Sequence, residues 1–322
     1  MSKKLKILVI RFSSIGDIIL TTPIIRCLKQ QLNSEVDFLT KNKYERLLVR
    51  NPNIREIFTL SDSSEYIMEI LRSKEYDFVV DLQGNLRSFK LRLALGVKSF
   101  VFSKENLKRY ILIYFGIDLL NNHIVDRYFK TVNKLNVYND NKGLDYFLPD
   151  SCDINFNINQ DYICWCIGGA HERKKLSVLQ ISDVISQLEM PVILLGASKE
   201  KALSTEIMAR IKSDNLYDFC GETSIEESAY LVQNSSLVLT NDTGMMHIAS
   251  AFDTPIISFW GCTKPSLGFG VYMPKNISES VITHLSEKPC SKHGKYCKFK
   301  SKGCIKEIAS EDIYKAIKRL LK

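Results

Sequence analysis

The chain lacks the features that define membrane-spanning, fibrous and nucleic-acid-binding proteins. None of its apolar stretches approaches the roughly 20 residues that cross a bilayer, and the best candidate, residues 111–120, is interrupted by Asp118. Glycine and proline are scarce, at 15 and 8 of 322 residues, whereas 45% of the chain is hydrophobic, which is typical of a globular protein with a large core. Lys and Arg outnumber Asp and Glu by 44 to 36 without forming a long basic run, so an anionic partner is expected and nucleic acid is disfavoured.

Two further absences concern the cofactor and the cell compartment. The turn after the first expected strand, residues 6–10, does not match the G-x-G-x-x-G fingerprint, which disfavours a nicotinamide enzyme. The N-terminal residues lead directly into that strand without a secretory cleavage site, so we expect a cytoplasmic protein. The cysteines number nine and lie mostly in apolar strands, where reduced thiols act as small hydrophobic side chains.

One local pattern, an apolar strand followed by a polar turn and a helix, occurs twice. Near the N-terminus the strand is 6–10, the turn 13–17 and the helix 18–32. In the second half an apolar strand leads into Asn241-Asp242-Thr243-Gly244, which opens a helix. Free backbone N–H groups and the positive dipole end at such a start favour a bound phosphate, and Gly244 allows close approach. In a plainer interpretation, Asp or Thr only caps the helix at each turn.

Continuous apolar runs predict parallel strands that are buried on both faces and connected through helices. The runs form two series, which a polar segment at residues 139–160 separates. The first series is 6–12, 36–40, 78–82 and 99–102, and the second is 162–167, 192–195, 216–220, 237–240 and 256–260. We therefore expect two doubly wound α/β domains, residues 1–155 and 156–322, with ligands in a cleft at the carboxyl ends of their strands. The last helix, 311–321, should pack on a domain face, with the N-terminal domain as one option.

The polar motifs of the chain resemble those of glycosyltransferase family 9, the ADP-heptose:lipopolysaccharide heptosyltransferases. In the family's order, and spanning nearly the whole chain, they are Arg11-Phe12-Ser13-Ser14-Ile15-Gly16-Asp17, Asp81-Leu82-Gln83-Gly84, Ser224-Ile225-Glu226 and Asp242-Thr243-Gly244-Met245-Met246-His247. The combination of S-S-x-G-D with D-T-G-x-x-H is specific, whereas either motif alone is weak. The resemblance implies a GT-B fold of two Rossmann-like domains, with the donor nucleotide held mostly by the second and the acceptor by the first.

The resemblance also implies a reaction. It is an inverting, metal-independent transfer of a heptose from a nucleoside-diphosphate sugar, ADP-heptose, to an acceptor of the lipopolysaccharide core type. No cofactor is implied beyond the ADP-sugar substrate, and the sequence has no D-x-D pair to hold a metal ion. Because the net charge is +8, peripheral contact with an anionic inner membrane surface is expected as well.

Such a transfer needs a base for the acceptor hydroxyl and positive charge for the departing diphosphate. The resemblance assigns the base role to Asp17, and a carboxylate at a helix start should have a lowered pKa, which makes it a weak base that takes the proton late. The resemblance assigns the phosphate contact to Lys174. The family has an aromatic residue and a proline shortly after this lysine, whereas this chain has Leu176 and Ser177, so Lys175 remains an alternative, as does a solvated basic turn.

The remaining site residues are implied by the resemblance too. Glu226 is assigned to the nucleotide ribose or, in the plainer interpretation, is an acid favoured by the dipole of its helix. His247 is either a site residue or a structural histidine. Gln83 and Arg87 are candidates for the acceptor. The donor-binding set comprises Ser14, Gly16, Gly169, Lys174, Glu226, Asp242, Thr243, Gly244 and His247.

A local cluster of thiols and one imidazole lies near the C-terminus. Its members are Cys290, His293, Cys297 and Cys304, with the spacing Cys-x2-His-x3-Cys-x6-Cys. The ligand count suits structural zinc, but the spacing is not one of the strong paired patterns, and reduced thiols are the alternative.

Two other functions are compatible with parts of the pattern. A GT-B nucleotide-sugar epimerase would share the fold and the phosphate turn, but it would need paired carboxylates and no acceptor site. A catalytically silent nucleotide-binding module would keep residues 242–247 and could dispense with Asp17. Because both end motifs are present, the sequence favours a transferase.

Overall fold

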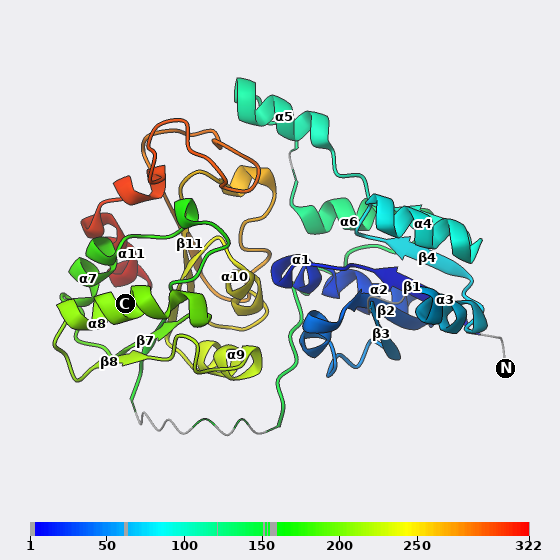
Figure 1. Ribbon diagram of the computed structural model, residues 1–322, viewed down its shortest axis with the longest axis horizontal. Coiled ribbons are helices and arrows are strands. Elements are labelled where there is room, and N and C mark those ends of the chain that lie inside the picture. The colour runs from blue at the N-terminus through cyan, green and yellow to red at the C-terminus, as the bar shows by residue number, and fades with distance from the viewer. Residues whose placement is uncertain are drawn as a thin grey trace. The chain divides into compact units, whose positions relative to one another are not determined.

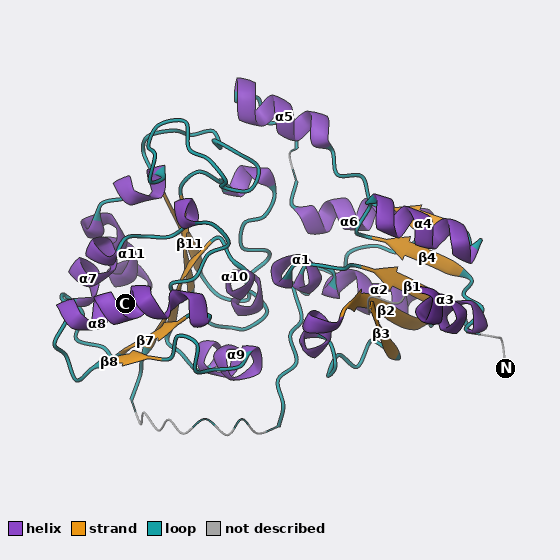
Figure 2. Ribbon diagram, viewed as in Figure 1, coloured by secondary structure: helices purple, strands orange, loops and turns teal. Residues whose placement is uncertain are grey.

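The computed structural model describes residues 4–60, 64–120, 122–150, 152, 154 and 160–321. Two compact units make up the chain (Figure 1). The first comprises Met1–Glu105 and Asn122–Phe147, and the second comprises Asn106–Asn121 and Leu148–Lys322. Both are built from helices around a sheet (Figure 2). The segment 106–121 thus belongs to the second unit, although the residues before and after it in the sequence belong to the first.

The first unit contains a five-stranded parallel sheet with the order β3-β2-β1-β4-β5. Its strands are β1 (Lys6–Ile10), β2 (Glu35–Lys41), β3 (Glu56–Leu60), β4 (Phe78–Asp81) and β5 (Ser99–Val101). The chain adds β2 and β3 on one side of β1 and then crosses to add β4 and β5 on the other. Ile10 pairs with Asp81, so the turns that follow β1 and β4 leave the sheet together at the point where the order reverses.

Helices of the first unit begin and end where local chemistry dictates. In α4 (Leu86–Leu95), the Asn85 side chain accepts from the Ser88 N–H at 2.9 Å, and Gly96 closes the helix with φ of 66°. The N-terminal Pro23 of α2 (Thr22–Leu32) suits a first turn, whose N–H groups have no helical partner. The other helices are α1 (Ile15–Ile19), α3 (Ser64–Ser73) and α6 (Ile124–Val132), with 3-10 turns η1 (Asn42–Leu47) and η2 (Asn133–Leu135).

The second unit contains a six-stranded parallel sheet with the order β11-β10-β9-β6-β7-β8. Its strands are β6 (Ile163–Cys166), β7 (Val192–Leu195), β8 (Leu216–Asp218), β9 (Leu237–Asn241), β10 (Ile256–Trp260) and β11 (Ser278–Ile282). The order reverses between β6 and β9, where Cys166 pairs with Thr240. The turn after β6 and the D-T-G turn after β9 therefore meet, as the corresponding turns do in the first unit.

The helices of this unit are α5 (Asn106–Phe115), α7 (Val178–Ile185), α8 (Lys201–Arg210), α9 (Ile225–Gln233), α10 (Gly244–Ala249) and α11 (Ser310–Leu320), with 3-10 turns η3 (Glu172–Lys174), η4 (Ser198–Glu200), η5 (Pro265–Leu267) and η6 (Cys304–Glu307). The last helix, α11, packs on α7 and β11. Its Ile313 and Ile317 are fully buried in the core of the second unit. The surface that this helix covers includes α7 and β11 of the second unit. No helix in the described ranges has the length and apolarity to traverse a bilayer.

Two edge strands, β3 and β11, were not expected from the sequence. The expectation was based on continuous apolar runs, which identify strands covered on both faces. In β11 only Val281 is buried, and β3 alternates between half-buried and buried positions towards its end. A strand at the rim of a sheet needs little apolar surface, because one of its edges has no neighbouring strand to bury it.

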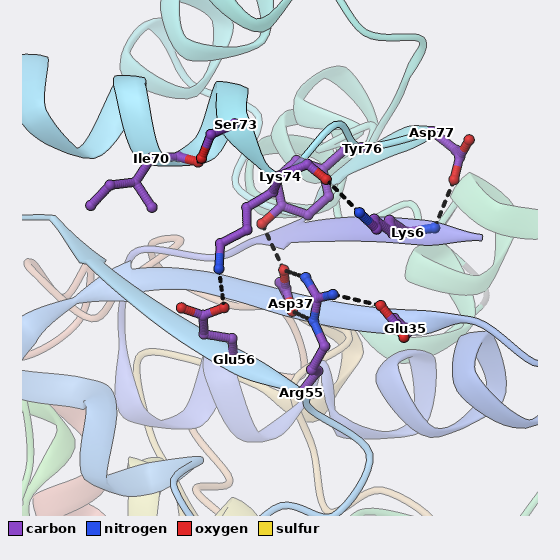
Figure 3. A network of polar contacts seen from close by, with 10 residues as sticks. All are labelled: Lys6, Glu35, Asp37, Arg55, Glu56, Ile70, Ser73, Lys74, Tyr76 and Asp77. Carbon is purple, nitrogen blue, oxygen red and sulfur yellow. Dashed lines mark hydrogen bonds and ion pairs between the residues drawn. The ribbon is translucent and has the colours of Figure 1, made fainter. Parts of the chain in front are cut away.

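A charged network ties β2, β3 and the end of α3 together in the first unit (Figure 3). The Asp37 side chain is fully buried on β2 and accepts bonds from Arg55 Nε at 2.9 Å, Arg55 Nη2 at 2.5 Å and the Tyr76 hydroxyl at 2.7 Å. Nearby, Lys74 Nζ lies 2.5 Å from Glu56, but both side chains are partly exposed. Because the Asp37 carboxylate is out of water, it depends on these donors for its charge.

Replacing Arg55 should therefore destabilise the protein much more than replacing Lys74. We expect Arg55→Ala to lower the free energy of unfolding by about 2 kcal/mol, because Tyr76 alone is left to bind a buried charge. Lys74→Ala, which removes a partly exposed pair from the same network, should cost less than about 1 kcal/mol. Urea unfolding of both variants measures the difference; equal losses would contradict the role of Arg55.

Candidate functional site

In the first unit, the turn after β1 places Asp17 in the first turn of α1. Asp17 Oδ2 accepts from the Ser14 backbone N–H at 3.1 Å and from the Ser14 hydroxyl at 2.8 Å, while Oδ1 pairs with Arg11 Nη2 at 2.7 Å. Asp17 is thus the third residue of its helix, and its carboxylate bonds back to the N-cap residue Ser14 in a capping box. Its side chain is still 24% exposed, so the carboxylate also remains within reach of solvent. Gly16 is buried beside it.

Arg11 is the residue that holds this carboxylate, and the sequence interpretation gave it no role. Its Nη1 donates to the Leu82 carbonyl at 2.7 Å and to the Tyr128 hydroxyl at 3.2 Å, and its Nε donates to the Ser13 carbonyl at 2.8 Å. These bonds fix the guanidinium across the ends of β1 and β4. The sequence did contain a signal for this role, because Arg11 directly follows an apolar strand and precedes the S-S-x-G-D motif.

The electrostatic consequence is a lowered pKa for Asp17. Burial alone would raise the pKa, but the Arg11 charge and the hydrogen bonds from Ser14 outweigh it. The direction agrees with the expectation for a carboxylate at a helix start, and the charge of Arg11 is the largest cause of the lowering. Asp17 is therefore anionic at neutral pH and a weak base.

The turn after β4 is organised by Asp81. This buried carboxylate accepts from the backbone N–H groups of Gln83 at 3.0 Å and Gly84 at 2.8 Å, and pairs with Arg92 Nε at 2.9 Å. The Gln83 side-chain oxygen in turn accepts from the Phe12 N–H at 2.9 Å, which joins the two turns. Of the candidate acceptor residues, Gln83 therefore has its oxygen occupied by the fold.

Arg87 is the second candidate for the acceptor and lies on the exposed side of α4. Its guanidinium carbon is 6.0 Å from the centre of the Phe12 ring, a cation–π distance. Phe12 directly precedes the S-S-x-G-D motif, so this contact keeps Arg87 beside the turn that carries Asp17. Its charge is free to meet an anionic ligand because the side chain is exposed.

In the second unit, Lys174 and Asp242 come together from two different turns. Lys174 ends η3, after β6, and its Nζ lies 2.6 Å from Asp242 Oδ2, directly after β9. The same Oδ2 accepts from the Thr263 hydroxyl at 2.8 Å. Lys175, the alternative phosphate lysine, is buried and pairs instead with Glu172 and with Glu200. The structure thus brings Lys174, and not Lys175, to the D-T-G turn.

Asn241 connects the same two turns through the backbone. Its buried side-chain amide donates to the carbonyls of Ile167 at 3.1 Å and Gly168 at 3.0 Å. Gly169 follows, and a Cβ built there would lie 2.7 Å from Lys175 Cγ, so this position accommodates only glycine without a shift of the lysine. The amide and the glycine together fix the turn that leads to Lys174.

The D-T-G turn opens α10 as the sequence predicts. Thr243 is the residue before the helix, and Gly244 begins it. His247 lies one turn along and is only 4% exposed, so its imidazole faces the interior of the unit.

Glu226 lies in the first turn of α9, as expected, but a different acid caps that helix. The Ser224 N–H donates to Glu227 Oε2 at 2.6 Å, and Ser224 Oγ accepts from the Glu227 N–H at 3.2 Å. Glu227 therefore caps the helix start, and Glu226 keeps the first-turn position in which the dipole of the helix favours an acid. Glu226 is half-buried and has no capping task.

A family model described as glycosyltransferase family 9 (heptosyltransferase) matches residues 66–301. The chain belongs to glycosyltransferase family 9. Across its length it is similar to lipopolysaccharide heptosyltransferase 1 of Campylobacter coli, with 28% identity over 98% of this chain and 99% of the relative. The resemblance stated from the motifs is confirmed, and the protein is a glycosyltransferase.

Solved structures show the same fold for this family 9 enzyme. A glycosyltransferase family 9 structure from Veillonella parvula matches with a TM-score of 0.76 and 19% identity, covering 98% of this chain and 97% of that one. The structure of E. coli ADP-heptose LPS heptosyltransferase II matches with a TM-score of 0.74 and 19% identity, covering 98% of both chains. The GT-B fold expected from the sequence is confirmed.

The cysteine cluster of the enzyme differs in one member from the set that local spacing suggested. Four thiols, those of Cys262, Cys290, Cys297 and Cys304, have sulfur atoms within 4.8 Å of one another. His293 was expected to be the fourth ligand, but its side chain is exposed and lies outside this group. Cys262 replaces it, directly after β10. Spacing along the chain could not find it, because only the fold brings the end of β10 to the C-terminal loop.

Proposed function

We propose that this family 9 glycosyltransferase moves a heptose from ADP-heptose to an acceptor of the lipopolysaccharide core type, with inversion at the transferred carbon. The Lys174–Asp242 pair at the D-T-G turn carries the proposal, because it puts a fixed cation at a helix start after two central strands. The relatives support the choice of substrates: the Campylobacter coli protein is a lipopolysaccharide heptosyltransferase, and the E. coli structure is that of an ADP-heptose LPS heptosyltransferase.

The second unit holds the donor in this proposal. Lys174 neutralises the diphosphate, and the backbone N–H groups of Thr243 and Gly244 donate to its oxygens. Asp242 holds the ammonium and, through Thr263, keeps the turn in place. Glu226, the first-turn acid that does not cap its helix, binds the ribose hydroxyls. Further donor-binding residues are Ser14, Gly16, Gly169 and His247, the last acting from the buried side of α10.

Asp17 is the base in this proposal. The acceptor oxygen attacks the anomeric carbon, the bond from that carbon to the diphosphate breaks, and the hydroxyl proton passes to Asp17. Because Arg11 and Ser14 lower the pKa of Asp17, proton transfer is favourable only when the attacking oxygen has become acidic, late in the reaction. ADP leaves with the bonding electrons, and Lys174 stabilises its negative charge. No step requires a cofactor or a metal ion at the diphosphate.

The acceptor contacts the first unit in this proposal, through Arg87 and the Gln83 amide nitrogen. Lipopolysaccharide-type glycans carry phosphates and acidic sugars, which suit the exposed guanidinium of Arg87. An epimerase would not need such a contact, and neither would a silent binding module. The family match, which is to transferases, likewise supports the transfer reaction over both alternatives.

We propose further that the enzyme is cytoplasmic and that its helix α5 contacts an anionic membrane surface. Leu112 and Ile113 of this helix are buried against Leu267 of its own unit. Apolar and aromatic side chains are exposed on the helix at Leu107, Tyr110, Tyr114 and Phe115, and after its end at Ile117 and Leu119. Aromatic and apolar groups on an exposed helix are typical of interfacial binding.

Cations lie beside this exposed helix. Lys298 Nζ donates to the Ile113 carbonyl at 3.0 Å and lies 5.0 Å from the centre of the Tyr114 ring. Lys288 Nζ donates to the Tyr114 carbonyl at 3.2 Å. The lysines place positive charge at the C-terminal end of α5, where it complements anionic lipid headgroups.

The donor proposal predicts a nucleotide preference that depends on Lys174. Among ADP, UDP, GDP and CMP, ADP should raise the melting temperature most, and Lys174→Ala should lose most of that shift because the diphosphate loses its cation. Lys295→Ala is the matched control: it removes a neighbouring charge whose side chain is exposed, so the ADP shift should persist. Equal stabilisation by UDP, or an unchanged shift in Lys174→Ala, would contradict the assignment.

The base proposal predicts that Asp17→Asn separates catalysis from donor binding. The asparagine oxygen can still accept from Ser14, so the turn should fold, whereas transfer should fall by about 100-fold or more without the base. The ADP thermal shift should remain close to that of the wild type. In the wild type, the lowered pKa of Asp17 should keep the base ionised as the pH falls, so kcat/KM should decline only at pH values below the usual range for aspartate. Retained turnover in Asp17→Asn would remove the base role.

The membrane proposal predicts salt-sensitive binding to anionic vesicles. The wild type should float with phosphatidylglycerol-containing liposomes at low salt and not with neutral ones, and a Leu107→Glu/Phe115→Glu variant should not float. Leu179→Glu is the control, since Leu179 is an exposed leucine on α7. Absence of the wild type from the anionic vesicle fraction at low salt would end this proposal.

A further inference from the structure

Four thiols from three separate segments of the second unit converge on one point. Cys262 follows β10, Cys290 and Cys297 lie between β11 and η6, and Cys304 begins η6. The sulfur atoms of Cys290 and Cys297 are 3.9 Å apart, and those of Cys262 and Cys304 are 3.7 Å apart. All four lie within 4.8 Å of one another.

These separations suit a shared metal ion and not disulfides. Four sulfurs at about 2.3 Å from a central ion, at the corners of a tetrahedron, are roughly 3.8 Å from one another. A disulfide needs a sulfur–sulfur distance of about 2.05 Å, and all nine cysteines of the chain are free thiols. The arrangement is therefore that of four ligands around a centre.

The surroundings provide what a tetrathiolate centre needs. The Lys300 N–H points to Cys297 Sγ at 3.3 Å, and the Cys290 N–H donates to the Cys262 carbonyl at 2.8 Å. Lys264, which is only 2% exposed, interacts electrostatically with all four cysteines. Four thiolates around a divalent cation carry a net charge of −2, and a buried ammonium offsets part of it.

The segment that carries two of these thiols has no regular secondary structure and little apolar packing around the cluster. Residues 283–303, all of them described, contain neither helix nor strand. The apolar side chains packed on the cluster are limited, within the described chain, to Leu285 beside the cysteines themselves. Long irregular segments are uncommon inside compact units, and a metal ion is one way to order them.

We propose that Cys262, Cys290, Cys297 and Cys304 bind one divalent transition-metal ion, Zn²⁺ as the expected ion, and that this centre holds the Lys174–Asp242 pair in place. Tetrahedral four-sulfur coordination is suited to zinc and to iron. The ion is structural, because four protein ligands leave no open position for substrate.

The cysteine cluster is coupled to the Lys174–Asp242 pair first through contacts with Lys174. A Cβ at Gly294, which has φ of +74° and lies between Cys290 and Cys297, would be 2.8 Å from Lys174 Cγ, so the cysteine loop packs directly on the lysine stem. The preceding Arg173 donates from Nη1 to the Lys295 carbonyl at 2.6 Å and from Nε to the Ser301 carbonyl at 2.9 Å. The loop therefore forms one wall of η3, and its order decides where Lys174 points.

The second set of contacts is with Asp242. Thr263, whose hydroxyl donates to Asp242 Oδ2, is the residue after Cys262. Both members of the ion pair are thus in contact with segments that the four thiols join. This coupling rests on the proposed role of the pair in donor binding, whereas the metal site does not.

Metal content tests the site. Full-length protein, with any affinity tag removed and purified under reducing conditions without added metal, should contain about one zinc per chain by elemental analysis. Cys297→Ser and Cys304→Ser should lose the metal, and Cys152→Ser, outside the cluster, should keep it. One equivalent of iron, recognised by its visible thiolate absorption, would support the four-thiolate site equally. Wild-type protein with less than about 0.2 equivalents of either metal would overturn it.

A second measurement guards against variants that fail to fold. In the wild type, modification of the thiols with a mercurial reagent should release one equivalent of metal to a chelating dye, with no mutation involved. Release of no metal from protein whose thiols have all reacted would overturn the site.

The ADP affinity of metal-loaded and chelator-stripped protein tests the coupling. We expect the dissociation constant measured by calorimetry to rise at least tenfold on stripping and to recover when Zn²⁺ is restored. An unchanged affinity would overturn the coupling. Failure of metal-loaded wild type to bind ADP at all would instead overturn the proposed function, with the metal site still supported by its own stoichiometry.

Discussion

In each unit, the parallel pairing of two central strands decides where chemistry can take place. β1 pairs with β4, and β6 pairs with β9, at the positions where the strand order reverses. The turns that follow these strands diverge to helices on opposite sides, which leaves backbone N–H groups and polar side chains together at the carboxyl edge. The S-S-x-G-D and D-T-G motifs are both such turns, so two distant sequence motifs have equivalent places in two similar folds.

Each of these places contains a motif carboxylate that is paired with a cation. Arg11 holds Asp17 in the first unit, and Lys174 holds Asp242 in the second, but the two pairs work in opposite directions. In the proposed mechanism the carboxylate of Asp17 is the functional group, and the fixed Arg11 guanidinium makes it a weak base. In the second unit the proposal gives the functional role to the Lys174 cation, which Asp242 positions. The same kind of ion pair would thus serve a proton acceptor in one unit and an anion site in the other.

Much of this arrangement was predictable from residue patterns. Continuous apolar runs identified the central strands, because strands covered on both faces need apolar residues at every position. The edge strands β3 and β11 escaped detection, since β11 buries only Val281. The motif residues Asp17, Lys174 and Asp242 were found by their resemblance to a family, whereas the roles of Arg11 and Glu227 became apparent only from hydrogen bonds across turns.

The sequence by itself determined the class of fold, the family and the positions of the two motif turns, because hydrophobic patterns and short motifs act over neighbouring residues. Only the tertiary structure showed that Lys174, and not Lys175, pairs with Asp242. Only the tertiary structure likewise showed that Cys262, and not His293, joins the other three cysteines. Each of those choices depends on segments far apart in the chain: Lys174 is selected by Asp242, and Cys262 by the loop at Cys290. Local spacing carries no record of such partners, because the sheet brings them together through strand order and register.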